Sequence, residues 1–140
     1  MIMRHPAVGI GSDGIFLGVP GKPDRSKPHP RYFGTFPRVV GKYTRDEAVL
    51  TLPQAVHKMT GLSAGILGLK DRGLIRGGMA GDVVIFDPRT VADTATFAEP
   101  HQQPRGIETV IVNGVVTVRG GKMTGNIGGK VLRRRHPVGR

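Results

Sequence analysis

Residues 108–118, Glu-Thr-Val-Ile-Val-Asn-Gly-Val-Val-Thr-Val, decide how the second half of this chain folds. Two runs rich in β-branched residues flank the dipeptide Asn113-Gly114. Asn and Gly both tolerate the positive φ angles of a two-residue hairpin turn, so the pattern predicts two antiparallel strands joined tightly. Gly120-Gly121 closes the second strand. Another strand is predicted at Val83-Val-Ile-Phe86, a β-rich run that Asp87-Pro88 closes.

Helices are predicted between the start of the chain and these strands. Thr51 and Gln54 have the spacing of a capping box, in which each residue satisfies a backbone N–H at the start of a helix. The apolar residues that follow recur at helical spacing, which predicts a helix over residues 51–60 that Gly61 ends. Two further helices are expected, over residues 35–43 and 63–69.

The chain opens with the apolar run Ala-Val-Gly-Ile at residues 7–10, followed by Gly11-Ser-Asp-Gly14. A short apolar run bounded by turn residues predicts a buried strand. Asp13 then lies at the carboxyl end of that strand, the edge at which α/β barrels carry out chemistry. Residues 15–34 are rich in proline and are predicted to form a loop that covers an active site.

Composition sets broad limits on the class of protein. The 140 residues suffice for one domain, and 22 glycines with 11 prolines favour many short elements. The chain has no cysteine, which excludes disulfides and thiolate metal sites within it. No apolar run has the length of a membrane span or of a signal peptide. We expect a cytoplasmic protein, although the lack of cysteine also fits the periplasm.

The formal net charge of +11 raises the question of nucleic-acid binding. The basic residues are scattered along the chain, and the one dense run, Arg133-Arg134-Arg135, has no interleaved aromatic residues on which bases would stack. Specific nucleic-acid binding is therefore not favoured. A basic, non-enzymatic module that recruits acidic partners or RNA stays open as an alternative.

The predicted elements do not make a self-sufficient fold. The strand at residues 7–10 has no partner strand nearby in sequence, and the helices need a surface to cover. We therefore expect this chain to be the end of something larger.

Several motifs occur together in a recognisable order. They are Ile-Gly-Ser-Asp-Gly (10–14), His-Pro-Arg-Tyr-Phe-Gly-Thr-Phe-Pro-Arg (29–38), Ala-Val-His-Lys-Met-Thr (55–60), Asp-Val-Val-Ile-Phe-Asp-Pro (82–88) and Thr-Val-Ala-Asp-Thr-Ala-Thr-Phe (90–97). The ordered set resembles the C-terminal third of the D-aminoacylases, the N-acyl-D-amino-acid deacylases of the amidohydrolase superfamily. Segment 29–38 is the most specific, and it argues against a dihydroorotase- or hydantoinase-like amidohydrolase.

The resemblance implies a fold class of α/β with β. Residues 1–72 would supply the last strand and the helices of an amidohydrolase (β/α)8 barrel. Residues 73–140 would supply the C-terminal part of a small β-sandwich. The rest of the barrel would come from upstream polypeptide or from a partner chain.

The resemblance also implies a reaction, the hydrolysis of the amide bond of an N-acyl-D-amino acid to a carboxylate and a D-amino acid. The complete enzyme would use Zn²⁺ to activate the attacking water. Asp13 matches the catalytic base and possible metal ligand, and Arg31 matches the residue that grips the substrate carboxylate. The other metal ligands of the family belong to earlier strands, so we expect this chain alone to be inactive.

Other residues are assigned structural roles. His29 stands between two prolines, which is typical of an exposed extended segment and not of a metal ligand. His57 is expected on a helix surface. Ser12 has no general base at a recognisable spacing and is not read as a nucleophile. Asp13 itself has a plain alternative, because Asp-Gly after a strand is a common turn.

Overall fold

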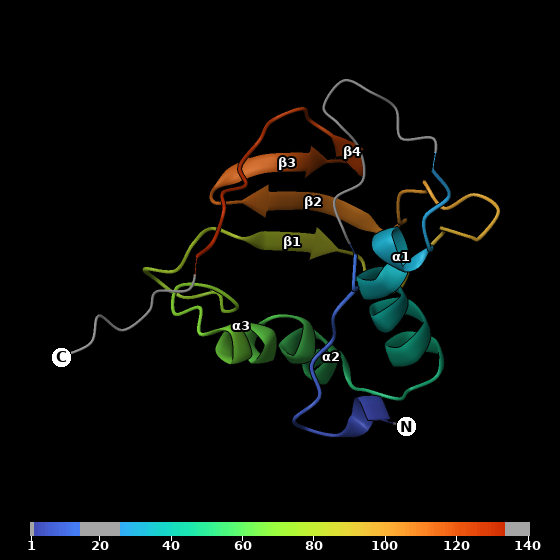
Figure 1. The fold of residues 1–140 in the computed structure, drawn as a ribbon, viewed down its shortest axis with the longest axis horizontal. Coiled ribbons are helices and arrows are strands. Elements are labelled where there is room, and N and C mark those ends of the chain that lie inside the picture. The colour runs from blue at the N-terminus through green and yellow to red at the C-terminus, as the bar shows by residue number, and fades with distance from the viewer. Residues whose placement is uncertain (1, 15–25, 134–140) are drawn as a thin grey trace.

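The computed structural model describes residues 2–14 and 26–133, and it joins a group of helices to one antiparallel sheet (Figure 1). The sheet order is β1-β2-β3-β4. The elements, in chain order, are the 3-10 turn η1 (Ile2–Arg4), α1 (Arg31–Arg38), the π-helical segment η2 (Val39–Asp46), α2 (Leu52–Met59), α3 (Gly61–Leu67), β1 (Val83–Phe86), β2 (Ile107–Val112), β3 (Val115–Arg119) and β4 (Lys122–Met123).

The predicted hairpin is confirmed. Strands β2 and β3 pair antiparallel, and Val112 faces Val115 across the turn. Asn113 and Gly114 both have positive φ, at 49° and 80°. The Asn113 side chain also ties the turn to distant segments, because its oxygen accepts a hydrogen bond from Arg72 at 2.7 Å and its nitrogen donates to the carbonyl of Gly128 at 2.6 Å.

The strand predicted at residues 83–86 is also confirmed. It forms β1, the edge strand, which pairs antiparallel with β2. A two-residue strand that the sequence did not reveal, β4, pairs with β3 on the other edge. Local sequence signals therefore account for the three longer strands of the sheet.

Helix α2 confirms the capping box. The Thr51 hydroxyl accepts from Gln54 N–H at 3.4 Å, and the Gln54 side-chain oxygen accepts from Thr51 N–H at 2.9 Å. Gly61 does not simply end the helix, as predicted, because α3 begins there. A Cβ at Gly61 would lie 3.2 Å from His57 Nδ1, so glycine permits the close step between the two helices. Gly68, with φ 72°, ends α3 in the left-handed conformation.

The prediction of a loop through residue 34 and a helix from 35 to 43 is wrong at its boundaries. Helix α1 already begins at Arg31, directly after Pro30, and continues through η2 to Asp46. A proline disrupts a helix interior, but its missing N–H is not needed at a helix start. Pro37, inside α1, removes one donor, and the wider π-helical turns follow directly after it.

The strand predicted at residues 7–10 is absent. Residues 8–14 run without regular structure, and the backbone N–H of Ile10 donates to the carbonyl of Lys58 at 3.1 Å, not to a neighbouring strand. A strand exists only where another strand pairs with it. None of the described strands lies beside this segment.

The helices and the N-terminal segment share a small core. Val39, Leu50 and Ala55 are buried together, and Ile10 is among the partly buried residues that pack against them. Burial of Ile10 anchors one end of the segment that carries Asp13 three residues later.

Two predictions fall partly outside the described residues. Residues 15–25 of the predicted cover loop and Arg134-Arg135 of the basic run are not described. Within the described residues, no helix combines the length and apolar character that would let it cross a membrane.

Candidate active site

The two residues that the sequence assigned to chemistry lie together. Arg31 Nη2 donates to Asp13 Oδ2 at 2.7 Å. The two residues are 18 positions apart, so the contact depends on the fold and not on local sequence. The Asp13 side chain is 87% exposed and the Arg31 side chain 40% exposed, so both groups are accessible to a small molecule.

Asp13 is held in an uncommon backbone conformation. Its φ of 49° lies in the left-handed region, which among residues other than glycine is adopted mainly by Asn and Asp. The Ser12 hydroxyl accepts from the N–H of Gly14 at 3.2 Å and closes the turn around Asp13. The prediction that Asp13 ends a buried strand is therefore corrected: its carboxylate lies in an exposed, tightly turned segment.

Arg31 is the first residue of α1, where the prediction had placed a loop. Its backbone N–H donates to His29 Nδ1 at 3.0 Å, and its guanidinium carbon lies 5.4 Å from the centre of the Tyr32 ring. The Arg31 Nε is buried and has no hydrogen-bond partner within the described structure. The guanidinium thus has donor capacity beyond its bond to Asp13.

The connection between β1 and β2 contacts the residues that flank Arg31. The sequence did not reveal these contacts. The rings of His29 and Phe97 meet edge to face with centroids 4.9 Å apart, and Phe33 and His101 meet at 5.3 Å. His101 Nε2 lies 2.8 Å from the carbonyl of Ser26. Phe97 ends the quoted motif at residues 90–97, which was the available signal, although no role had been assigned to it.

The same connection holds helix α1 in place. Arg38 pairs with Asp93 at 2.7 Å, and a Cβ at Gly34 would lie 3.0 Å from Asp93 Cβ. Seven residues later, in η2, Arg45 Nη1 donates to the carbonyl of Val91 at 2.8 Å. The hydrogen bond from Arg45 to the neighbouring Asp46 lowers the pKa of that carboxyl and keeps both side chains charged. Arg31 is therefore presented by a braced helix.

The remaining histidines behave as expected or lie apart from the site. His29 is exposed and accepts from the backbone of Arg31, so it serves the helix start. His57 is exposed on α2. Ser12 uses its hydroxyl in the turn around Asp13.

The described residues do not by themselves fit a zinc site. A zinc ion needs about three or four ligands of the His, Cys, Asp or Glu type in close array. No group of three such residues that could hold a metal occurs in the described part of the chain. Asp13 offers one accessible carboxylate.

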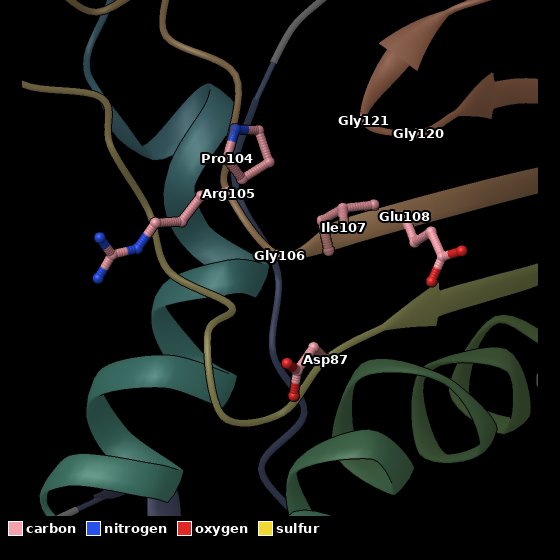
Figure 2. A pocket seen from close by; sticks show the side chains of 8 residues that line it. All are labelled: Asp87, Pro104, Arg105, Gly106, Ile107, Glu108, Gly120 and Gly121. Carbon is pink, nitrogen blue, oxygen red and sulfur yellow. The ribbon is translucent and has the colours of Figure 1, made fainter.

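A surface hollow of about 350 Å³ lies at the end of the sheet, lined by residues that include Asp87, Arg105 and Glu108 but neither Asp13 nor Arg31. Figure 2 shows that the carboxylates of Asp87 and Glu108 point in different directions and that Arg105 points away from both. The backbone N–H and the guanidinium of Arg89 both donate hydrogen bonds to Asp87. These bonds lower the pKa of the Asp87 carboxyl, and the backbone bond has the larger effect. The charged groups do not converge, so this hollow is not the candidate site.

Comparison with known proteins identifies the family of this chain. A model of the amidohydrolase family matches residues 2–118, and the chain belongs to that family. The chain is 48% identical to a D-aminoacylase from Alcaligenes xylosoxydans xylosoxydans over 125 residues, which are 89% of this chain and 24% of that protein. It is 47% identical to an N-acyl-D-aspartate deacylase of the same organism, over 81% of this chain and 21% of that protein.

Solved structures agree. The crystal structure of a D-aminoacylase superposes with a TM-score of 0.84 at 45% identity, covering 95% of this chain and 27% of that one. The N-acyl-D-glutamate deacylase of Bordetella bronchiseptica, solved with zinc and a phosphonate mimic of the tetrahedral intermediate, gives 0.73 at 45% identity, covering 83% and 23%. The resemblance to D-aminoacylases is confirmed, and this chain spans about a quarter of each relative's length.

Proposed function

We propose that this chain is the C-terminal part of a metal-dependent hydrolase that cleaves the amide bond of N-acyl-D-amino acids, and that it is inactive alone. Similarity to D-aminoacylases over nearly the whole chain supports the reaction class. It also favours this function over a basic binding module or a dihydroorotase- or hydantoinase-like enzyme. Coverage of about a quarter of each relative supports the dependence on further polypeptide.

One observation carries the assignment of the site: an accessible carboxylate and an accessible guanidinium, distant in sequence, lie 2.7 Å apart. Hydrolysis of an acylated amino acid needs a base for the attacking water and a cation for the free carboxylate of the substrate. Among the carboxylates that form ion pairs in the described residues, Asp13 is the most exposed, and its partner is Arg31. Their proximity supports a single site that holds both ends of the substrate.

Asp13 would act as the general base. Its carboxylate oxygen takes a proton from the attacking water and passes it to the nitrogen of the leaving amine, so one group serves both halves of the reaction. Exposure of the side chain leaves room for water and substrate, and the turn at residues 12–14 fixes its direction. Zinc in the complete enzyme would lower the pKa of the water and polarise the amide carbonyl, with its other ligands outside this chain.

Arg31 would hold the α-carboxylate of the substrate. A guanidinium presents paired N–H groups that match a carboxylate in a two-point contact. Asp13 engages the guanidinium through Nη2, while Nε is buried and does not face a substrate. The braced start of α1 fixes the distance between the gripped carboxylate and the scissile amide, which is the geometry that catalysis requires.

The proposed division of the chain is the one that the resemblance to D-aminoacylases implies. Residues 1–72 would belong to the catalytic barrel, and residues 73–140 to the β-sandwich domain. The helical character of the first part and the antiparallel sheet of the second support this division. The remainder of the barrel is then an obligatory partner, either upstream or as another chain.

Turnover assays test the proposal. The purified 140-residue chain, supplied with zinc and N-acetyl-D-methionine, is expected to release no D-methionine. When the missing barrel polypeptide is supplied, hydrolysis is expected. In that complete enzyme Asp13→Asn lowers kcat by about 10²–10⁴-fold because the base is lost. Arg31→Met mainly raises KM because the substrate carboxylate loses its partner.

Arg76→Met serves as the matched control, because Arg76 is an exposed arginine outside the site. It is expected to leave both constants unchanged. Robust turnover by the chain alone would refute its dependence on further polypeptide. Full activity of Asp13→Asn in the complete enzyme would refute the role of Asp13.

A further inference from the structure

Lys58 is unusual among the described residues. It is 4% exposed, and it is the one polar or charged residue that the described part of the chain buries. A lysine is almost never buried fully unless it is paired. None of the ion pairs within the described residues involves Lys58. Its burial therefore needs an explanation other than a salt bridge.

The partners of Lys58 are backbone carbonyls of the N-terminal segment. Its Nζ donates to the carbonyl of His5 at 2.6 Å and to that of Val8 at 2.8 Å. Its own carbonyl accepts from the N–H of Ile10 at 3.1 Å and from the hydroxyl of Ser63 at 2.9 Å. A single residue of α2 thus holds the segment at three points between residues 5 and 10.

This segment leads directly to Asp13 and has no strand ladder of its own. Helix α2, in contrast, is fixed by its capping box and by Ala55 in the core. The geometry points to Lys58 as a positioning residue, which transfers the fixed position of α2 to the Asp13 segment and so sets Asp13 against Arg31. The catalytic consequence rests on the proposed function, whereas the structural effect does not.

An apolar residue of similar length would fill the same space without these bonds. Packing alone constrains a segment weakly along its own direction, because apolar contacts are not directional. Two short hydrogen bonds from one ammonium group fix the distance of residues 5–8 from α2 and the orientation of the two carbonyls that accept them. Lys58 therefore does for this segment what a neighbouring strand does in a sheet.

The first test uses NMR on the 140-residue chain with Lys58→Met. Loss of the ammonium is expected to speed amide exchange at Ile10 by about tenfold and to shift the amide signals of Asp13 and Gly14. The guanidinium N–H signals of Arg31 are expected to shift toward those of an arginine that has no ion-pair partner. Lys70→Met, at an exposed lysine, is the matched control and should change none of these signals.

The second test restores the ammonium chemically. Because the chain has no cysteine, Lys58→Cys introduces a unique thiol. In the unfolded chain its thiolate displaces bromide from 2-bromoethylamine, forming a C–S bond and a side chain that ends in an ammonium close to that of lysine. The same reaction with 1-bromopropane gives a neutral side chain of equal length. After refolding, only the amine adduct should recover the Ile10, Asp13 and Arg31 signals.

The outcomes of these two tests distinguish a positioning role of Lys58 from a space-filling role. If both adducts give native signals, or if Lys58→Met lowers stability without changing the Asp13 and Arg31 signals, Lys58 is a space-filling residue and the inference is wrong. If only the amine adduct folds at all, Lys58 serves the whole fold and the specific positioning role is also wrong.

A kinetic arm connects the effect to catalysis. In the complete enzyme, Lys58→Met is expected to lower kcat by about tenfold or more with KM little changed, because the base is displaced while the carboxylate grip on α1 stays. If the unsubstituted complete enzyme shows no deacylase activity, the proposed function fails. The NMR result on the Asp13 segment still decides the positioning role.

Discussion

The hairpin of β2 and β3 and the segment at residues 8–14 are built in opposite ways. The β2–β3 pairing forms within residues 107–119, around a turn whose two residues both tolerate positive φ, and further bonds join that turn to Arg72, Gly81 and Gly128. The Asp13 segment makes almost no bonds within itself and takes its position from Lys58 on a helix some fifty residues later. The conformation of the hairpin turn is favoured by its own residues, whereas the segment at residues 8–14 is positioned by contacts with α2.

The candidate site lies in the region that depends on contacts with the rest of the chain. The self-contained hairpin carries no candidate catalytic group. The segment that depends on others carries Asp13 in the left-handed backbone region, exposed to solvent. Functional groups are commonly held in such conformations by surrounding structure that is more stable than they are.

Hydrogen exchange should show the largest contrast. Amides in the β2–β3 ladder are expected to exchange about a thousandfold more slowly than those of Ser12 and Asp13, because ladder amides open only with large-scale unfolding. Exchange of the intact chain, followed residue by residue by NMR, measures the ratio. Comparable protection in the two regions would show that the Asp13 segment is not dependent in the way described.

Two glycine substitutions compare a crowded position beside the sheet with an open position in α3. Gly106→Ala is expected to lower the free energy of unfolding by about 3 kcal/mol, because its φ is 76° and the new Cβ would lie 2.5 Å from Val91 N. Gly65→Ala, inside α3 with open space around it, should instead raise stability by about 0.5–1 kcal/mol. Denaturant unfolding measures both, and equal effects would contradict the close approach at Gly106.

Asn113 allows the turn to be separated from its side-chain bonds. Asn113→Ala is expected to cost about 2 kcal/mol, because it loses both the tolerance of positive φ and the bonds to Arg72 and Gly128. Asn113→Gly keeps the turn and should cost about 1 kcal/mol. If the two variants unfold at the same denaturant concentration, backbone conformation is not part of the role of Asn113.

The smallest expected effect is a change with pH at the end of β1. Bonds from the Arg89 N–H and guanidinium lower the pKa of Asp87 in the folded chain relative to the unfolded one. The resulting stabilisation is complete above the unfolded pKa, near pH 4, and is lost as the pH falls through the folded pKa. Asp87→Asn should flatten the fall in stability between about pH 5 and pH 2; an unchanged slope would show that Asp87 makes no such contribution.

Local signals predicted much of the fold. The Asn113-Gly114 turn and the Thr51–Gln54 box are patterns in which a few adjacent residues satisfy one another, so tertiary contacts need only agree with them. The start of α1 was missed because Pro30 was read as a helix breaker when it precedes the first helical turn. The strand at residues 7–10 was predicted wrongly, because an apolar run gives burial but does not supply a pairing partner.

The sequence singled out two candidate site residues, but it did not indicate how the fold holds them. The resemblance named Asp13 and Arg31, and the structure places them in contact. Nothing in the spacing of residues indicated that Phe97 and His101 would lie against His29 and Phe33. Such contacts join segments more than sixty residues apart and arise only when the helices and the sheet are packed together. The bonds of Lys58 were hidden for the same reason.

The side chain of Arg72 has a consequence for how this chain could have evolved. It reaches from the helical part to Asp82 and Asn113 in the sheet, and only 9% of it is exposed. A chain divided at residue 73, or a sheet region exchanged for that of another protein, would leave this largely covered cation facing mismatched partners. The two parts are therefore expected to be inherited together, so recombination that treats them as separate modules should be selected against.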